Sequence, residues 1–246
     1  MKIVKAIPNT ITSLNLFSGC LAIIMVFQGQ LHVASMFIGI AAVLDFFDGF
    51  AARLLKAYSE IGKQLDSLAD MVSFGLAPSF IIYSLINDVL KTDGFYSQMP
   101  VSEIVLLCLP FLIAVFSALR LAKFNIDTNQ TTSFIGLPTP ANAILIASLP
   151  VLLWYYDYSF INLLIHNLYF LVGLIFLQSF LLVAKIPMFS LKFSNFQFRD
   201  NKIRFIFLGI SLVLLITLQA VSIPIIIFLY ILISLFTNYL ITKKRN

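Results

Sequence analysis

Residues 44–75 read LDFFDGFAARLLKAYSEIGKQLDSLADMVSFG, and this stretch sets four aspartates among apolar residues. Asp45 and Asp48 are three positions apart, so both face one side of a helix. Asp66 and Asp70 are four positions apart and share a helix face in the same way. A carboxylate inside a membrane helix costs about 2.5–3.5 kcal/mol on insertion scales. The four together indicate a site where a cation neutralises their charge.

The composition indicates that lipid surrounds this stretch. Of the 246 residues, 60% are hydrophobic and only 11% are charged, whereas soluble domains carry about 25% charged residues. A soluble fold would have too little polar surface to cover this much apolar side chain. Cys20 and Cys108 lie in apolar stretches and show no disulfide or zinc spacing. The sequence therefore predicts an all-α, polytopic membrane protein.

Eight apolar runs are long enough to cross about 30 Å of hydrocarbon as helices. They lie at approximately 11–28, 31–54, 65–87, 102–122, 138–156, 159–183, 203–220 and 224–242. We interpret the first run as a retained span, because no small-residue cleavage site follows it. The spans leave no room for a separate soluble domain, so we expect residues 1–246 to form a single membrane domain.

The distribution of basic residues predicts the orientation. With the N-terminus in the cytoplasm, 15 of the 16 Lys and Arg residues fall on the cytoplasmic side, and only Lys91 lies outside. Eight spans then place both termini in the cytoplasm. The net charge of +5 is explained by topology. Because the basic residues are not interleaved with exposed aromatics, we expect no nucleic-acid partner.

The two aspartate-bearing helices are expected to be antiparallel neighbours joined by a short link around residues 56–61. Both pairs of carboxylates would then lie at similar depth, near the cytoplasmic face, and meet across one cleft. Only oxygen ligands are offered there, which suits Mg²⁺, Mn²⁺ or Ca²⁺ and disfavours zinc and copper. Four carboxylates can hold two such ions about 3.5–4 Å apart, as in phosphoryl-transfer sites.

Small residues accompany the aspartates. Gly49 and Ala52 lie on or beside the Asp48 face of the helix, and Gly62 lies four positions before Asp66. Glycine inside a helix costs about 1 kcal/mol relative to alanine. It is useful where a ligand approaches the backbone, although close helix packing would explain it equally well. Arg53 could pair with a diphosphate through its forked guanidinium or serve only as a cytoplasmic anchor.

Together these residues form the pattern D-x2-D-G-x2-A-R-x8-G-x3-D-x3-D between positions 45 and 70. At every fixed position the pattern is similar to the signature of the CDP-alcohol phosphatidyltransferase family. The resemblance implies a six-helix membrane core, at about residues 8–185, with two additional C-terminal helices at about 203–242. It also implies a CDP-linked substrate and a homodimer.

The resemblance further implies roles for the residues of the pattern. Two divalent cations, Mg²⁺ or Mn²⁺ (Ca²⁺ is possible in a crystal), would be bound by Asp45, Asp48, Asp66 and Asp70. Asp70 would also act as the general base. The CDP moiety would contact Gly49, Ala52, Arg53 and Gly62.

Three further stretches narrow the resemblance. Residues 8–12 with Asn15 resemble the family's N-terminal segment, which implies that Asn9 and Thr12 lie near the nucleotide. Residues 120–125 (RLAKFN) and 134–142 (FIGLPTPAN) resemble the membrane-integral phosphatidylserine synthase subgroup. The candidate serine-binding residues in these two stretches are Arg120, Lys123, Asn125, Thr139 and Asn142. The cations among them could equally be membrane anchors, and the prolines could simply start a helix.

The resemblance implies a reaction that transfers the phosphatidyl group of CDP-diacylglycerol, a membrane lipid, to the hydroxyl of L-serine and releases CMP. A direct displacement is preferred, because His32 and His166 lie in distant segments and form no pair with a nucleophile. The enzyme would lie in the cytoplasmic membrane with its site facing the cytoplasm. A synthase that uses glycerol 3-phosphate or inositol phosphate is the main alternative. A cation transporter is more distant, because the acids cluster at one face instead of following a path.

Overall fold

The computed structural model describes residues 2–91, 99–126, 134–188, 197 and 201–245, with side chains described between residues 6 and 237. Its α-helices are α1 (Lys2–Phe27), α2 (Leu31–Leu54), α3 (Glu60–Asp70), α4 (Ala77–Leu90), α5 (Val101–Cys108), α6 (Phe111–Ile126), α7 (Thr139–Tyr155), α8 (Ser159–Ile165), α9 (Leu168–Val183), α10 (Lys202–Leu218) and α11 (Ser222–Arg245). A π-helical segment, η1 (Met71–Leu76), joins α3 to α4, and a 3-10 turn, η3 (Gln219–Val221), joins α10 to α11. Two short strands, β1 (Phe134–Ile135) and β2 (Pro187–Met188), pair antiparallel.

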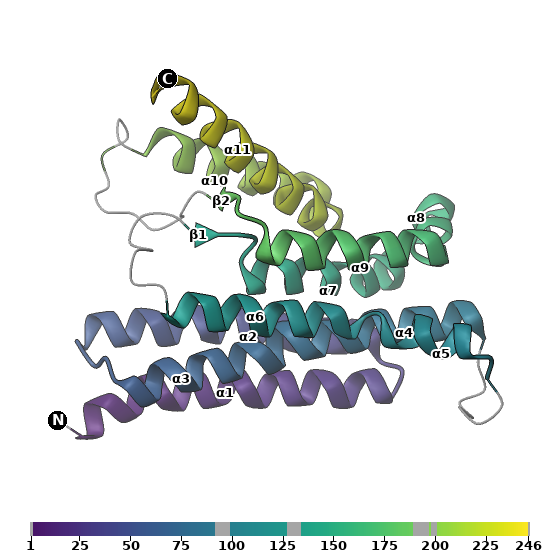
Figure 1. Cartoon of the computed structure of the whole chain (residues 1–246), viewed down its shortest axis with the longest axis horizontal. Coiled ribbons are helices and arrows are strands. Elements are labelled where there is room, and N and C mark those ends of the chain that lie inside the picture. The colour runs from purple at the N-terminus through teal and green to yellow at the C-terminus, as the bar shows by residue number, and fades with distance from the viewer. Residues whose placement is uncertain (1, 92–98, 127–133, 189–196, 198–200, 246) are drawn as a thin grey trace.

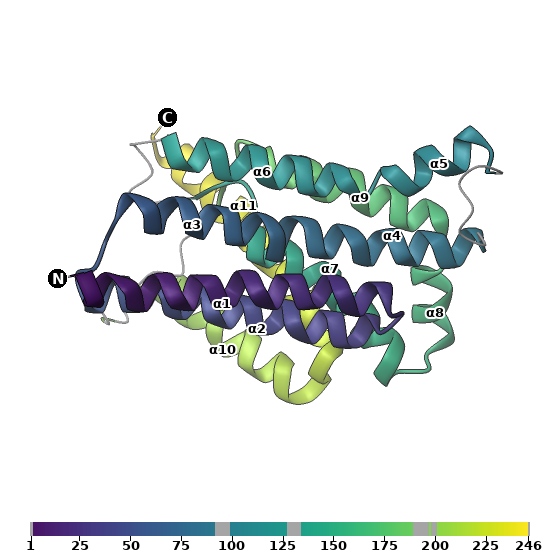
Figure 2. The same ribbon diagram turned by 90° about the horizontal axis from the view of Figure 1, so that it is seen from below.

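The helices form two layers (Figure 1). The first layer holds α1 to α6, which run nearly parallel to one axis, and the second holds α7 to α11. In the first layer α1 packs against α2 and α3, while η1 packs against α1 and α6. The second layer rests on the first through α7 against α2 and α9 against α6. Seen from below, α1, α3 and α6 follow one another across the molecule (Figure 2).

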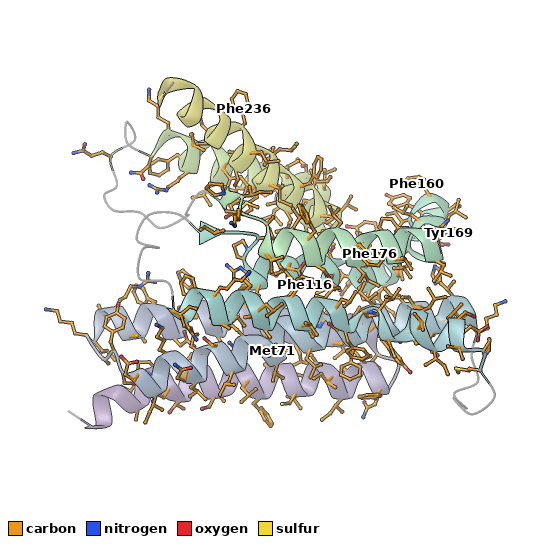
Figure 3. The ribbon with its side chains drawn as sticks, in the orientation of Figure 1. Met71, Phe116, Phe160, Tyr169, Phe176 and Phe236 are labelled. Carbon is orange, nitrogen blue, oxygen red and sulfur yellow. The ribbon has the colours of Figure 1, made fainter. Side chains whose placement is uncertain are left out.

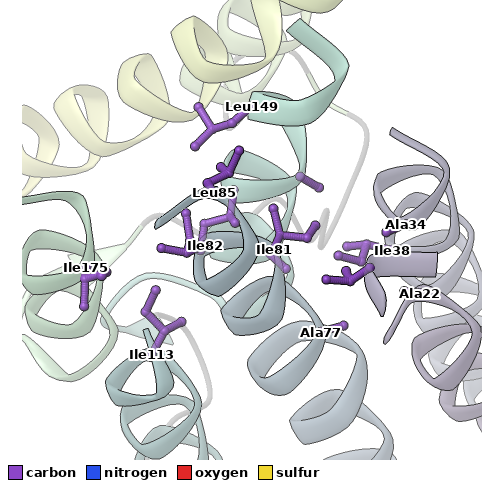
Figure 4. Packing of buried hydrophobic residues seen from close by; sticks show 14 of the residues in the cluster. Ala22, Ala34, Ile38, Ala77, Ile81, Ile82, Leu85, Ile113, Leu149 and Ile175 are labelled. Atoms are coloured by element: carbon purple, nitrogen blue, oxygen red, sulfur yellow. The ribbon is translucent and has the colours of Figure 1, made fainter. Parts of the chain in front are cut away.

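The apolar core is centred on α4. Ile81, Ile82 and Leu85 of this helix are at most 1% exposed. Figure 4 shows them between Ile113 of α6 and Ile175 of α9 on one side and the helices α1 and α2 on the other. Because lipid tails are as apolar as these side chains, close packing and dispersion hold this core together more than transfer from water does.

The outer surface of the helices is apolar as well. Phe160, Tyr169 and Phe236 are 72%, 87% and 64% exposed, and Figure 3 shows them on the outside of α8, α9 and α11. A soluble protein seldom exposes so much apolar surface. The helical stretches long and apolar enough to cross a membrane are Ala6–Phe27, Leu31–Leu54, Glu60–Leu90, Val101–Ile126 and Lys202–Thr237. The all-α, polytopic membrane architecture is therefore confirmed.

The number of spans depends on how broken helices are counted. The pair α8 and α9 would make a sixth span, but it is bent by 66° at His166–Asn167. The helix α7 is shorter, with 17 residues, and α10 turns back into α11 at Gln219, where φ is +47° (Figure 2). Each predicted range overlaps a helix. Five of the described helical stretches, or six with the bent pair, are long and apolar enough to cross a membrane. The count of eight and the cytoplasmic termini stay predictions.

The short β ladder fixes the start of α7 on the end of α9. The backbone N–H groups of Gly136 and Leu137 donate to Ile186 O and Leu181 O, each at 2.9 Å. Gly136 has a φ of +77°, and a Cβ at this position would lie only 2.4 Å from Leu182 O. Only glycine fits there. The glycine of the FIGLPTPAN stretch therefore seats the first turn of α7 against α9.

Candidate active site

The four aspartates converge from two helices. Asp45 and Asp48 lie in the second half of α2. Asp66 and Asp70 lie in the second half of α3. One carboxylate oxygen from each of Asp45, Asp48 and Asp66 lies within 4.8 Å of the other two. Since α3 packs chiefly on α1, α1 supplies a third wall to the space between the carboxylates.

Asp70 is buried beside Asp45. The two carboxyl groups lie within hydrogen-bonding reach of each other, and Asp70 is only 8% exposed. Its Oδ1 atom has no hydrogen-bond partner among the described residues. The π-helical segment begins directly after it, at Met71, and such segments are frequent at functional sites. Asp70 is therefore held in a dry position with one oxygen available to a ligand.

A cavity of about 710 Å³ lies beside the aspartates. Three of the aspartates line it, together with Asn9 and Thr12 of α1 and the small residues Gly49, Ala52 and Gly62. Its volume falls within the range of about 300–1,000 Å³ that is common for small-molecule sites. The structure thus gathers in one cavity every residue predicted to bind metal or CDP, apart from Asp70 and Arg53.

The two glycines of the cavity have different surroundings. A Cβ at Gly49 would meet nothing within 4 Å, so the space beside this backbone is open. A Cβ at Gly62 would lie 2.8 Å from Asn9 Oδ1 and 2.9 Å from Ser59 Oγ. Ser59 caps α3, because its Oγ accepts a hydrogen bond from Gly62 N at 3.0 Å. Close packing thus explains Gly62, whereas Gly49 borders space that a ligand can use.

Thr12 lies beside the aspartates, whereas Arg53 lies outside the cavity lining. The hydroxyl of Thr12 donates to Pro8 O at 3.0 Å and also lies against the Asp48 carboxylate. Arg53 is exposed, and its Nε donates to Gly49 O at 3.0 Å, within its own helix. The structure therefore brings Thr12 to the aspartates and leaves Arg53 outside the lining of the cavity.

A second polar group adjoins Asp70. Arg120, in α6, is near enough to the Asp70 carboxylate for the two charges to interact, and its Nη1 donates to Thr139 Oγ1 at 3.4 Å. Thr139 and Asn142, one turn apart in α7, are both 0% exposed. Within the described residues, Arg120 Nε and both amide atoms of Asn142 have no hydrogen-bond partner. Buried polar groups are normally paired, so this arrangement suits a polar ligand.

The two remaining candidate serine-binding residues lie elsewhere. Lys123 is exposed near the C-terminal end of α6. The side-chain amide of Asn125 donates to Ser67 Oγ at 2.8 Å, and Asn125 O accepts from Lys63 Nζ, also at 2.8 Å. Asn125 thus fastens α6 to α3. The hydrogen bonds of the described residues bring neither Lys123 nor Asn125 to Arg120.

Sequence reasoning missed Lys63, Tyr58 and Glu60, which line the same cavity. In the sequence Lys63 is indistinguishable from a cytoplasmic anchor, Tyr58 lies in the link between the helices, and Glu60 is the first residue of α3. The available signal was their position inside the pattern, between Arg53 and Asp66. A link that closes a ligand cavity contributes side chains to it.

The donor set fits divalent cations. Three carboxylates converge within 4.8 Å, and no histidine or cysteine belongs to this group of described residues. Asp48 Oδ2 and Asp70 Oδ1 are buried and accept no hydrogen bond from the described residues. Oxygen-only sites of this kind favour Mg²⁺, Mn²⁺ or Ca²⁺. Asp45, Asp48 and Asp66 could therefore hold a cation, with Asp70 next to them.

Comparison with known proteins identifies the family. The model of the CDP-alcohol phosphatidyltransferase family matches residues 5–178, which include the whole aspartate pattern. The chain belongs to the CDP-alcohol phosphatidyltransferase family. The matched region ends within α9, so α10 and α11 lie beyond the part of this phosphatidyltransferase that the family model covers.

Several relatives of this family member have names that specify an acceptor. A CDP-diacylglycerol–serine O-phosphatidyltransferase of Helicobacter pylori is 34% identical over 141 residues, which cover 56% of this chain and 54% of the relative. The Bacillus subtilis protein of the same name is 37% identical over 134 residues, covering 54% and 69%. An archaetidylserine synthase of Methanothermobacter thermautotrophicus is 30% identical over 145 residues, covering 58% and 57%. The chain spans about half to two thirds of the length of these relatives.

Proposed function

We propose that this family member transfers the phosphatidyl group of CDP-diacylglycerol to the hydroxyl of L-serine and releases CMP. The observation that carries the proposal is the position of Asp70, which lies beside the aspartate-lined cavity and beside the group formed by Arg120, Thr139 and Asn142, here called the Arg120 group. A base in that place lies between a donor site and an acceptor site. The names of the relatives support serine as the acceptor.

The cavity suits the nucleotide and diphosphate of the donor. Divalent cations held by the aspartates, Mg²⁺ or Mn²⁺, would supply positive charge to the diphosphate. The open backbone at Gly49 and the small side chain of Ala52 leave space for the nucleotide. On the same helix Phe46 and Phe50 are 61% and 47% exposed. They offer an apolar surface along which acyl chains can remain in lipid.

Asp70 would accept the proton of the serine hydroxyl. As this proton leaves, the serine oxygen forms a bond to the phosphorus that carries diacylglycerol. The bond from this phosphorus to the oxygen of CMP breaks, and CMP departs with the electron pair. The burial of Asp70 keeps water from competing with serine, and a positioned base of this kind typically contributes about 10²–10⁴-fold to the rate.

The Arg120 group would bind the acceptor. A guanidinium binds a carboxylate through two parallel hydrogen bonds, and Arg120 Nε is free of protein partners among the described residues. Asn142 Oδ1 can accept a hydrogen bond from the serine ammonium. Since Arg120 and Asp70 are neighbours, a serine held by its carboxylate has its hydroxyl near the base. A guanidinium binds a phosphate in the same forked geometry, so the choice of serine over a phosphate-bearing alcohol rests on the names of the relatives.

The location of the protein is part of the same proposal. We place it in the cytoplasmic membrane, as a homodimer, with the site facing the cytoplasm. Each chain would be one membrane domain whose catalytic core is residues 8–185. Figure 1 places the start of α1 and the end of α11 toward one end of the helices, where the link between α2 and α3 also lies. This arrangement supports placing both termini and the site on the same side of the membrane, and the distribution of basic residues makes that side the cytoplasmic one.

The test is a comparison of acceptors. Purified protein in mixed micelles receives CDP-diacylglycerol with serine, glycerol 3-phosphate or inositol phosphate, each with and without Mn²⁺ or Mg²⁺, and CMP release is measured. We expect release with serine and a divalent cation only. Release with another acceptor alone would reassign the protein within its family.

A matched pair of variants tests the base. Asp70→Asn is expected to lower kcat by about 10²–10⁴-fold. Asp88→Asn is the control, because Asp88 lies near the other end of the same helical stretch, Glu60–Leu90. It should leave kcat unchanged. Full turnover by Asp70→Asn would remove the proposed base.

A further inference from the structure

Tyr230 of α11 is buried against the beginning of α7. It is 6% exposed and belongs to an apolar cluster with Leu137, Leu181 and Phe207. The rings of Tyr230 and Phe207 are 5.9 Å apart, which joins α10 to the same cluster. Leu137 lies two residues before Thr139, the first residue of α7. The cluster therefore locks the C-terminal hairpin onto the turn that presents Thr139 and Asn142.

The same packing brings Tyr230 near enough to Arg120 for the two side chains to interact electrostatically. Arg120 donates a hydrogen bond to Thr139 of α7 at 3.4 Å, and Asp70 of α3 and Tyr230 of α11 are its electrostatic neighbours. A guanidinium offers five N–H donors in one plane, and a phenol oxygen can accept one of them. Neighbours on three elements favour one orientation of the guanidinium, and its Nε has no hydrogen-bond partner among the described residues, so that it can bind a ligand.

We propose that Tyr230 is a positioning residue for the acceptor, which orients the Arg120 guanidinium so that α11 forms part of the acceptor site. This inference rests on the proposed function, because it takes the Arg120 group as the acceptor site. Tyr230 lies outside residues 5–178, the region shared with the family. The C-terminal hairpin thus adds an acceptor-specific element to a core that binds the CDP-linked donor.

The experiment is Tyr230→Phe, which keeps the ring in its apolar cluster and removes only the hydroxyl. We expect the KM for the acceptor to rise about tenfold, the size of one hydrogen bond to a charged group. The KM for CDP-diacylglycerol and kcat should stay within twofold of the parent. Tyr169→Phe, in a residue that is 87% exposed on α9, is the matched control and should change none of the three.

A double variant separates positioning from packing. In an Arg120→Lys background the planar guanidinium is gone, so Tyr230→Phe should add less than twofold to the acceptor KM. A purely structural role would instead lower the melting temperature and alter both KM values in either background. An unchanged acceptor KM in Tyr230→Phe, or equal changes in both KM values, would overturn the proposal.

The acceptor panel keeps the two hypotheses apart. The kinetic comparison uses whichever acceptor supports CMP release by the parent protein. If that acceptor is glycerol 3-phosphate, the proposed serine specificity fails, while the effect of Tyr230→Phe on its KM still decides the role of Tyr230. If serine is used and Tyr230→Phe matches the parent, only the role of Tyr230 fails.

Discussion

Replacing Gly49 by alanine separates a binding role from a packing role. A methyl group at this position would meet no protein atom within 4 Å, so the folded state accepts it without strain. Alanine is favoured over glycine in a helix interior by up to about 1 kcal/mol. The melting temperature of Gly49→Ala should therefore equal or exceed that of the parent protein.

The same substitution should weaken the binding of CDP-diacylglycerol. Gly49 lines the 710 Å³ cavity beside Asp48, and the new methyl group would occupy space that we assign to the nucleotide. Forcing an extra methyl group into a well-packed contact costs about 1–3 kcal/mol. This is about a 5- to 150-fold loss of affinity, at 1.4 kcal/mol per factor of ten. The KM for CDP-diacylglycerol should rise by that factor, while the KM for serine should not change.

Gly39→Ala is the control, because Gly39 lies in the same helix and does not line the cavity. A Cβ at Gly39 would also meet no atom within 4 Å. It should share the stability gain without a kinetic effect. The assay measures CMP release against the mole fraction of CDP-diacylglycerol in mixed micelles, with melting followed by intrinsic fluorescence. A Gly49→Ala protein with an unchanged KM would show that the donor does not use the space beside Gly49.

Three further outcomes are expected. Asp66→Asn should lower kcat/KM by at least about 100-fold, as loss of a metal ligand does, and should abolish the rise in melting temperature that we expect Mn²⁺ to produce in the parent. Gly136→Ala should destabilise the protein by about 1–3 kcal/mol, because φ is +77° there and a Cβ would clash with Leu182 O; an unchanged melting curve would contradict this. Ile82→Ala should cost about 2–5 kcal/mol in the 0%-exposed core, with both KM values retained, as measured by denaturation and kinetics on one preparation.

The aspartate cluster could be predicted because its determinants are local in the sequence. The spacing of Asp45 and Asp48 sets a shared helix face, and a short link returns the chain to the same depth. The spacing does not show which helix packs against each aspartate-bearing helix. The structure shows α3 packed on α1, with Asn9 and Thr12 in the cavity wall. Here the resemblance to the family supplied what periodicity lacked.

The broken span could not be predicted from hydropathy. Residues 159–183 are apolar enough to read as one helix, yet the chain bends by 66° at His166–Asn167. The cause is a cap: Asn167 Oδ1 accepts a hydrogen bond from Phe170 N at 3.1 Å and starts α9 afresh. A hydropathy average is insensitive to one polar residue, although that residue decides where the helix begins.

The residues that surround the proposed acceptor site were harder to predict, for a reason that applies to membrane proteins in general. In water, the apolar face of a helix marks its buried side, but in lipid both faces are apolar and this signal vanishes. The informative residues are then the few polar ones, which avoid lipid. On α11, Tyr230 and Ser234 are one turn apart and are 6% and 1% exposed, with Ser234 Oγ donating to Tyr230 O at 2.8 Å. These two residues mark the face of α11 that turns toward the protein, and Tyr230 on that face lies near enough to Arg120 to interact with it electrostatically.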